Sequence, residues 1–430
     1  MTELEKRVLH YVEEHQDDLY QELSRLVRFD STNHITWGEE RECAEYIAEE
    51  YRKMGLESDL YCPDDIPGFT SHPEYLSNRG TDKRPNVTAT FKGTEGNGSV
   101  MLAAHIDTVT VGDRSAWKHD PFGGEISGGC IWGRGSGDDK SGIAMSLFAM
   151  RTLKALNIKL KKDVLCTAYV DEESGGGNGA LAACLKYPCE AYINIDGGTK
   201  CDVAAPGGGC FRLRVRTKEA VASTVPVVKA LYRAVEELLP LGEDARAGLA
   251  GHPMLNRPEL VNNAFRLLSF RNGGSGVLLD RGELTFGVYT VMPKEEMLAK
   301  LKAIETRLRP EWDVLGIETD GFELYTRYFI FGDADQNGVS AEFLQAAEEV
   351  YGEPAAMLGA RALSDLSLFL AYGSASSLNT GITRSPNLPG GVHQVDEYIE
   401  CEHLLRHTQS ILLFLLRHCG AENMEGDHAE

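Results

Sequence analysis

The sequence has few basic residues for its length. It contains 43 Lys and Arg against 65 Asp and Glu, which gives a formal net charge of −22 over 430 residues. Proteins that bind nucleic acid or anionic membrane surfaces need clustered Lys and Arg, so this balance argues against both kinds of partner. Apolar residues make up 42% of the chain, which is enough for a core and argues against disorder. The acidity reflects either a solvated surface or carboxylates that form a site.

Long hydrophobic runs are also absent. The densest run, at residues 411–416, falls far short of the ~20 apolar residues that a membrane span requires. The N-terminus has neither the basic nor the apolar region of a secretory signal. The ten cysteines include no CxxC pair, so we expect buried reduced thiols rather than a disulfide framework. These features predict a protein of the cytoplasm.

Short apolar runs alternate with helical patterns through the first half of the chain. This alternation is typical of βαβ units, so we expect an α/β fold with a mostly parallel sheet flanked by helices. Apolar residues at helical spacing between positions 4 and 27 predict one amphipathic helix at the N-terminus. The other expected elements of this half are strands at 87–91, 99–104, 164–170 and 191–195 and helices at 143–156 and 175–185.

The pattern changes after the Gly-rich stretch at residues 205–209. Beyond it we expect a compact α+β insertion, and the α/β alternation resumes at residue 341 and ends in a helix at 402–418. The expected elements of the insertion are strands at 211–215, 283–291 and 321–328, helices at 225–239 and 294–308, and a further strand that the pattern allows at 265–270. We therefore divide the chain into an α/β domain over 1–208 and 329–430 and an inserted domain over 209–328.

Three expected strands end in side chains that bind metals or transfer protons. The strand at 99–104 runs into His105-Ile106-Asp107, and the strand at 191–195 runs into Asp196. The strand at 164–170 runs into three consecutive acids at 171–173. Ligands bind outside the carboxyl ends of strands in an open α/β sheet, so we expect one shared site. His105 and Asp107 point to the same face, where an acid can hold one imidazole nitrogen while the other binds a metal.

Each of these segments also has a simpler interpretation. His105 alone could be a core histidine, and the acids at 171–173 could form a solvated loop. The adjacent Asp138 and Asp139, in the loop GRGSGDDKSG at 133–142, could simply cap a helix. Crowded carboxylates are costly unless a cation lies among them, and a divalent metal would leave one Glu as ligand and its neighbour for proton transfer. The chain has no Gly-Lys dipeptide for a Walker A loop and no G-x-S-x-G motif.

A competing interpretation rests on Gly175-x-Gly177-x-x-Ala180. This stretch follows a strand and opens a helix, and Asp196 ends the next strand, as in a dinucleotide-binding fingerprint. However, the three carboxylates at 171–173 would repel a pyrophosphate, and the loop is not at the first βα turn. A nucleotide-dependent enzyme and a catalytically inactive interaction protein remain the alternatives from other classes.

Two further motifs complete a pattern. They are WKHDPF at 117–122 and PGGVHQVDEY at 389–398, which contains His393. In this order, the motifs resemble the zinc metallopeptidase family of aminoacylase, acetylornithine deacetylase, succinyl-diaminopimelate desuccinylase and carboxypeptidase G. The resemblance runs from the strand at 87–91 to the C-terminal helix. It implies a zinc-exopeptidase-like catalytic domain with an inserted lid or dimerisation domain, which in this family often forms a homodimer.

The resemblance also implies two divalent metal ions, zinc first and cobalt or manganese as substitutes. Asp138 would bridge both metals. His105 and Asp196 would bind one metal, and Glu173 and His393 would bind the other.

The remaining implied roles are catalytic. Asp107 would orient His105, and Glu172 would be the general base that takes a proton from a metal-activated water and returns it to the leaving amine. The implied reaction is hydrolysis of the amide bond of an N-acyl amino acid or short peptide. A deacylase is favoured over a dipeptidase or carboxypeptidase.

The inserted domain departs from the family's pattern. Val221 stands where the family has a His, and residues 276–279 and 288–290 also differ from the expected motifs. His252 could replace the missing imidazole or be a surface loop residue. Arg384 could meet a substrate carboxylate or be an ordinary surface arginine. The sequence therefore leaves the acyl group and the amino acid open.

Overall fold

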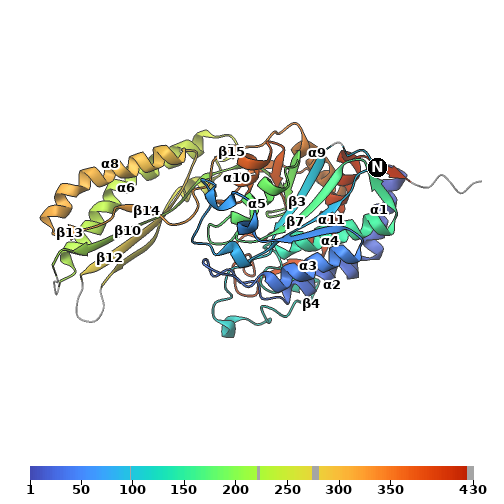
Figure 1. The fold of residues 1–430 in the computed structure, drawn as a ribbon, viewed down its shortest axis with the longest axis horizontal. Helices are drawn as coiled ribbons and strands as arrows, with labels where there is room; N and C mark the ends of the chain where they lie inside the picture. The colour runs from blue at the N-terminus through green and yellow to red at the C-terminus, as the bar shows by residue number, and fades with distance from the viewer. Residues whose placement is uncertain (97, 220–222, 274–279, 424–430) are drawn as a thin grey trace, which may run out of the picture. The chain divides into compact units, whose positions relative to one another are not determined.

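The structure is a computed structural model that describes residues 1–96, 98–219, 223–273 and 280–423 (Figure 1). The chain separates into two compact units. Unit 1 comprises Met1–Val203, Asp333–Leu358 and Leu368–Glu430, and unit 2 comprises Ala204–Gly332 and Gly359–Ser367. Each unit has its own sheet and hydrophobic core, so the two are described separately.

The main sheet has the strand order β1-β2-β7-β3-β8-β17-β9-β15, and β16 pairs with β9. Its central neighbours β7, β3, β8 and β17 run parallel, whereas β1, β2 and β7 pair antiparallel. The predicted mostly parallel sheet is thus found at the centre. The strands are β1 (Glu57–Tyr61), β2 (Asn86–Phe91), β3 (Ser99–His105), β7 (Asp163–Tyr169), β8 (Ala191–Asn194), β9 (Cys201–Ala205), β15 (Gly332–Asp333), β16 (Met357–Gly359) and β17 (Ser377–Asn379). Two smaller sheets of unit 1 comprise β4 (Glu125–Ser127), β5 (Cys130–Trp132) and β18 (Tyr398–Glu400), and β6 (Ile158–Leu160) with β19 (Ala421–Asn423).

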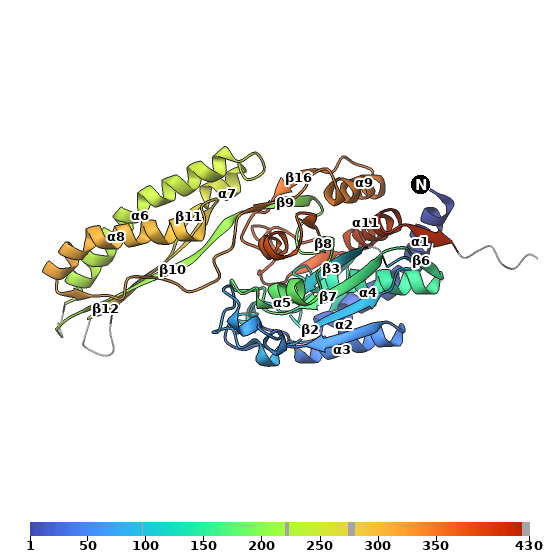
Figure 2. The same ribbon diagram turned by 45° about the horizontal axis from the view of Figure 1, so that its top comes forward.

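Helices cover both faces of the central strands (Figure 2). On one face, α5 packs with the short helix at Phe369–Gly373 against Met101, Ala103 and Tyr192. On the other face, α4 lies between β3 and the helices α2 and α11, which explains why it is apolar on nearly every side. The helices of unit 1 are α1 (Glu3–Glu14), α2 (Gln16–Val27), α3 (Arg41–Lys53), α4 (Lys140–Ala155), α5 (Asn178–Lys186), α9 (Val339–Tyr351) and α11 (Cys401–His418). The short helix α10 (Leu366–Leu368) begins in unit 2 and ends with Leu368 of unit 1.

The single N-terminal helix predicted from the sequence is wrong, because two helices meet at His15. The backbone of His15 leaves the helical region, with φ −112° and ψ 20°. Its imidazole Nδ1 lies 2.8 Å from the carbonyl of Tyr11, and the two rings stack. A side chain that bonds to the preceding turn competes with continuation of the helix. The apolar stripe therefore extends through two helices rather than along one continuous helix.

Unit 2 has an antiparallel sheet of order β11-β12-β10-β13, and β14 also pairs with β10. Helices α6 and α8 pack beside one another against this sheet (Figure 1). The elements are β10 (Gly207–Thr217), α6 (Val225–Gly251), α7 (Pro258–Asn262), β11 (Phe265–Asn272), β12 (Arg281–Thr290), α8 (Lys294–Val314), β13 (Ile317–Glu318) and β14 (Phe322–Leu324). The strand that the sequence allowed at 265–270 is confirmed as β11.

Three predicted boundaries in unit 2 are wrong. Helix α6 continues past the expected end at 239 to Gly251, with Pro240 inside it, because Leu241, Ala245 and Leu249 extend its buried face. Helix α8 likewise continues past Pro310 and buries Trp312. Packing of an apolar face outweighs the local cost of a proline. The strand expected at 321–328 is shorter, since β14 covers only Phe322–Leu324.

Within the part of the chain that the structure describes, no helix is both long enough and apolar enough to cross a bilayer. The ten cysteines all have free thiols.

Candidate metal centre

The central sheet brings the predicted strand-end residues together. Strands β7, β3 and β8 are adjacent and parallel, so their carboxyl ends lie at the same edge. His105 is the last residue of β3, the acids at 171–173 follow β7, and Asp196 follows β8. Topology alone therefore places an imidazole and several carboxylates side by side.

Two groups of candidate ligands share Asp138. His105, Asp138 and Asp196 form one group, and Asp138, Glu173 and His393 form the other, with the ligand atoms of each group within 4.8 Å of one another. Oδ1 of Asp138 lies 2.9 Å from Nε2 of His105, and Oδ2 lies 3.0 Å from Nε2 of His393. Nε2 of His393 is also 3.1 Å from Oε1 of Glu173. The Asp138 carboxylate thus faces one imidazole with each oxygen, the arrangement of a bridging ligand.

The backbone of Asp107 holds the second nitrogen of His105. Nδ1 of His105 lies 2.8 Å from the Asp107 carbonyl oxygen and 3.9 Å from its carboxylate Oδ1. The carboxylate instead accepts hydrogen bonds from the backbone N–H groups of Glu172, at 3.1 Å, and Glu173, at 3.0 Å. Asp107 therefore contacts the imidazole through its main chain and the turn after β7 through its side chain.

The pKa values of the clustered residues are shifted in the directions expected where carboxylates lack a nearby positive charge. Burial alone would lower the pKa of His393, but hydrogen bonds to Asp138 and Glu173 raise it to about 11. Burial would also lower the pKa of His105, yet Asp138 and the nearby carboxylates of Glu172 and Asp107 hold it well above its ordinary value. Burial and then the charge of Asp138 raise the pKa of Asp196 to about 7. The carboxylates thus draw protons onto both imidazoles. Asp196 resists ionisation, whereas hydrogen bonds from His105 and His393 outweigh burial and hold the pKa of Asp138 well below its ordinary value. This pattern is expected for a site that needs positive charge.

The donor set fits divalent metal ions. It consists of imidazole nitrogens and carboxylate oxygens without a thiolate, which suits zinc and also admits cobalt or manganese. The shared carboxylate would serve two ions at once. No ligand residue would need to come from unit 2.

The loop that carries Asp138 is bound by Glu397, a residue for which the sequence predicted no role. Its carboxylate Oε1 accepts hydrogen bonds from the N–H groups of Gly135, at 3.1 Å, and Gly137, at 3.2 Å. Its other oxygen pairs with Arg134, and the Arg134 guanidinium lies over the ring of Trp117, 5.2 Å from its centroid. These contacts join the stretches 117–122, 133–142 and 389–398. Glu397 lies inside the stretch 389–398, so its proximity to His393 was the available signal.

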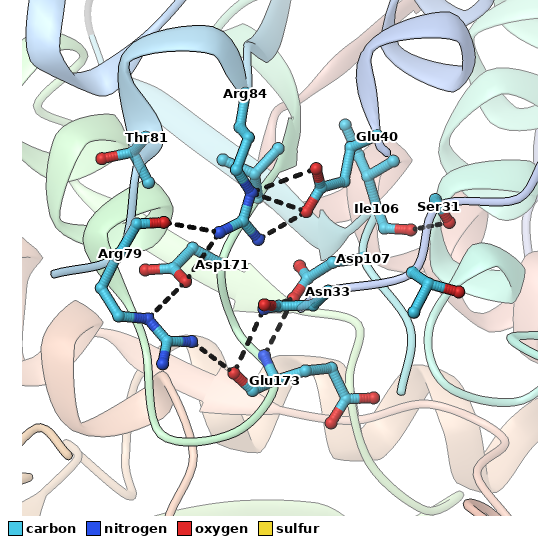
Figure 3. Close-up of polar contacts among 12 residues, drawn as sticks. Ser31, Asn33, Glu40, Arg79, Thr81, Arg84, Ile106, Asp107, Asp171 and Glu173 are labelled. Carbon is cyan, nitrogen blue, oxygen red and sulfur yellow. Dashed lines mark hydrogen bonds and ion pairs between the residues drawn. The ribbon is translucent and has the colours of Figure 1, made fainter. Parts of the chain in front are cut away.

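Several buried polar residues around the turn after β7 were also missed. A network of hydrogen bonds joins Asp171, Asp107 and the Glu173 backbone to four of them, namely Arg79, Arg84, Glu40 and Asn33 (Figure 3). The two arginines lie in an irregular segment between β1 and β2. Such a segment has no periodicity from which burial could be predicted.

The structure describes only some of the residues that were considered for substrate recognition. Val221 and residues 276–279 lie outside the described residues, whereas 288–290 are part of β12. His252 follows α6 in unit 2, where its ring packs edge-on against Phe331. Arg384 pairs with Glu400 at 2.5 Å and lies over the ring of Tyr398. Arg384 is therefore committed to contacts within unit 1.

The loop proposed as a dinucleotide fingerprint is filled by the chain itself. The N–H of Asn178, the first residue of α5, donates to Oδ2 of Asp171 at 3.3 Å. A Cβ on Gly176 would lie 2.6 Å from Oδ1 of Asp171, so the glycine is explained by this close approach. The helix N-terminus that would receive a pyrophosphate already holds a carboxylate.

Comparison with known proteins agrees with this geometry. Residues 101–417 match the model of peptidase family M20/M25/M40. An N-formyl-4-amino-5-aminomethyl-2-methylpyrimidine deformylase of Halalkalibacterium halodurans is 39% identical over 127 residues, 29% of each chain. A succinyl-diaminopimelate desuccinylase of Rhodospirillum centenum is 26% identical over 269 residues, which cover 60% of this chain and 69% of the relative. The chain thus spans less than a third of the deformylase and about two thirds of the desuccinylase.

Solved structures show the same fold. Human carnosine dipeptidase 1 has a TM-score of 0.71 at 14% identity, over 96% of this chain and 98% of the other. A dinuclear metal-binding peptidase from Bacillus subtilis has a TM-score of 0.59 at 16% identity, over 95% of this chain and 99% of the other. Because the family model covers well over half of its length, the chain belongs to peptidase family M20/M25/M40.

Proposed function

We propose that the protein is a metal-dependent hydrolase of the amide bond of an N-acyl amino acid or short peptide. The observation that carries the proposal is the Asp138 carboxylate, which lies between His105 and His393 and belongs to both groups of candidate ligands. Family membership supports the same reaction class. Two divalent ions, which we propose to be zinc, would complete the centre.

The assignment of roles follows the geometry. We assign His105 and Asp196 to one metal, Glu173 and His393 to the other, and Asp138 to both. When bound, the metals would lower the pKa of a water molecule and polarise the substrate carbonyl.

The chain's own groups handle orientation and protons. Glu172 accepts the proton of the attacking water and delivers it to the leaving nitrogen. Its backbone N–H is fixed by Asp107, and its carboxylate is close enough to His105 to raise the pKa of that imidazole. Asp107 holds His105 through its carbonyl, which fixes the imidazole so that Nε2 faces the metal.

We favour a deacylase over a dipeptidase. The two relatives named above are a deformylase and a desuccinylase, each of which removes an acyl group from nitrogen. The dipeptidase named above shares the fold at only 14% identity, which carries no information on substrate.

We assign residues 1–208 and 329–430 to catalysis and the insertion at 209–328 to a lid or dimerisation role. In the described part of unit 2, β11 is the last strand of its sheet and exposes Leu267, Leu268 and Phe270 by 40 to 48%. An apolar strand at a sheet edge pairs readily with a second chain, which supports a homodimer through the insertion. The cytoplasmic location remains a prediction from the sequence.

The test combines metal analysis with a substrate panel. Purified protein should contain about two zinc ions per chain and release amine from N-acyl amino acids or dipeptides, and a chelator should abolish the release. Amine release that persists after complete metal removal would contradict the mechanism. Absence of metal together with NAD binding would support the nucleotide alternative.

A further inference from the structure

The turn after β7 has a backbone that its sequence does not favour. Asp171 and Ser174 both adopt positive φ values, 68° and 61°, and the two residues flank Glu172 and Glu173. Side-chain-bearing residues rarely adopt this conformation, and it persists only where surrounding contacts hold it. The turn that presents the candidate base and a candidate ligand therefore requires support from elsewhere in the fold.

Arg79 supplies three contacts along this turn. Its Nε donates to Oδ1 of Asp171 at 2.8 Å, and its Nη2 donates to the Glu173 carbonyl at 2.8 Å. Its Nη1 donates to the carbonyl of Ser174 at 3.4 Å. The Arg79 side chain is only 2% exposed. One planar guanidinium thus contacts both of these residues with positive φ and the ligand residue between them. Figure 3 shows the contacts to Asp171 and Glu173.

Arg84 holds the same carboxylate from a second direction. Its Nη1 donates to Oδ1 of Asp171 at 3.2 Å and to the carbonyl of Arg79 at 3.0 Å. Its Nε donates to Glu40 at 2.9 Å. The group contains two arginines and the two acids Glu40 and Asp171, and all four side chains are buried. Their charges balance within the group, so the arginines do not replace the positive charge that the metal centre needs, and their contribution is geometric.

The opposite side of the turn is held by Asp107 and Asn33. Asp107 accepts from the N–H groups of Glu172 and Glu173, and Nδ2 of Asn33 donates to Asp107 at 2.7 Å and to the Glu173 carbonyl at 3.3 Å. The peptide groups of the turn are therefore bound by Asp107 and Asn33 and by Arg79, while Arg84 contacts the side chain of Asp171.

The arginines belong to a segment of unit 1 that is itself held in place by hydrogen bonds. They lie between β1 and β2, where Asp64 accepts hydrogen bonds from Tyr75 at 2.7 Å and from Thr81 at 2.5 Å. The side chain of Asn178, at the start of α5, bonds to the N–H and carbonyl of Leu76 at 3.1 and 3.0 Å. The segment is thus fixed on the helix that follows the turn.

We infer that Arg79 and Arg84 are positioning residues that clamp the turn and so set the placement of Glu172 and Glu173. The inference rests on the proposed function. It adds that the irregular segment between β1 and β2 determines how well one of the two metal groups, the one containing Glu173, is formed. Because the clamp depends on the fork of donors in a guanidinium, a lysine of equal charge cannot replace it.

The experiment compares wild type with R79K and R84K and with the control R41K. Arg41 contacts the same segment at the carbonyl of Lys83 but does not touch the turn, and it is half exposed. Metal-free proteins are titrated with zinc, the visible spectra of their cobalt-loaded forms are recorded, and kcat and KM are measured separately.

We expect R79K and R84K to bind one zinc equivalent as tightly as wild type and the other roughly 10- to 100-fold more weakly, the usual cost of removing a group that orients a ligand. The cobalt spectrum should change, and kcat should fall about 10- to 100-fold with little change in KM. R41K should match wild type in every measurement.

The results distinguish a failure of the inferred clamp from a failure of the proposed function. R79K and R84K with two tight zinc equivalents and wild-type kcat would overturn the clamp, whereas a wild type that binds no metal and hydrolyses no amide would overturn the proposed function. If the lysine variants do not fold, D171N decides, because the amide keeps an oxygen for Arg79 but removes the charge that both arginines share. Weakened binding of one zinc in D171N supports the clamp, and unchanged binding overturns it.

Discussion

The two units use their arginines differently. In unit 1, the ion pairs Arg79–Asp171, Arg84–Glu40 and Arg134–Glu397 are buried, and no side chain among them is more than 3% exposed. In unit 2, arginines of the sheet pair at the surface, as Arg216 and Glu318 show with exposures of 72% and 44%, although Arg327 is buried. These three buried pairs of unit 1 adjoin loops that carry candidate metal ligands.

The difference indicates what each kind of pair does. A surface pair contributes at most about 1 kcal/mol, because water already solvates both partners. A buried pair gains little over an apolar substitute, yet removing one partner costs about 3–5 kcal/mol because a charge is left without compensation. Unit 1 thus uses buried charge to hold particular loops in place, whereas unit 2 uses charge to solvate a sheet.

The largest effect is expected at Glu172, the residue that the buried network presents. E172A should retain its metal content and lose turnover by roughly 10²–10⁴-fold or more, because the proposed base is removed while the candidate ligands remain. Metal content and kcat are measured on the same preparation. Near-wild-type turnover would remove Glu172 from the mechanism.

The next effect tests a buried pair of unit 1. E397A leaves the Arg134 guanidinium buried without its carboxylate and frees the N–H groups of Gly135 and Gly137. We expect a loss of about 3–5 kcal/mol in the free energy of unfolding, measured by urea denaturation with tryptophan fluorescence. Zinc affinity should fall as well, since the loop carries Asp138. A change below about 1 kcal/mol would show that burial does not distinguish the two units.

A smaller effect is expected at a buried group without a charged partner. Burial, and then His403, lowers the pKa of His407 to about 3, and its ring nitrogens face Thr380 at 3.1 Å and Tyr351 at 3.5 Å. Below pH 6.5 the unfolded chain binds a proton that the folded chain does not, so stability is lost as pH falls from about 6.5 towards 3. Wild type should lose about 2 kcal/mol more than H407Q between pH 6.5 and 5. Parallel pH profiles of the two proteins in urea denaturation would contradict this assignment.

The smallest effect is expected at the surface of unit 2. E318A removes the partner of Arg216 from an exposed pair at 2.9 Å, so the free energy of unfolding should change by less than about 1 kcal/mol. Zinc affinity and kcat should match wild type. A loss comparable to that of E397A would mean that exposure is a poor guide to the role of these pairs.

The sequence predicted the elements whose signal is local. Strands β2, β3, β7 and β8 were predicted from their apolar runs, and the site residues after β3, β7 and β8 were identified because these runs end abruptly in polar side chains. The end of α6 could not be predicted, because Pro240 suggests a stop that only the packing of Leu241 and Leu249 overrides. Arg79 and Arg84 were missed for a related reason. In an irregular segment, a buried arginine and a surface arginine look alike in sequence, and the partners of these two are distant in the chain: the turn after β7 and Glu40, which precedes α3.

The contacts of Glu397 have a consequence for how the protein is made. Glu397 bonds to Arg134, 263 positions earlier in the chain, and His393 meets Glu173 across 220 positions. During synthesis, β3, β7 and β8 leave the ribosome well before either residue exists. The nascent chain can pair β7, β3 and β8 early, but it lacks one imidazole and the carboxylate that contacts the Asp138 loop until residues 393 and 397 emerge. The candidate centre is therefore assembled only after residue 397 has been synthesised, and metal binding at the full set of ligands would follow that point.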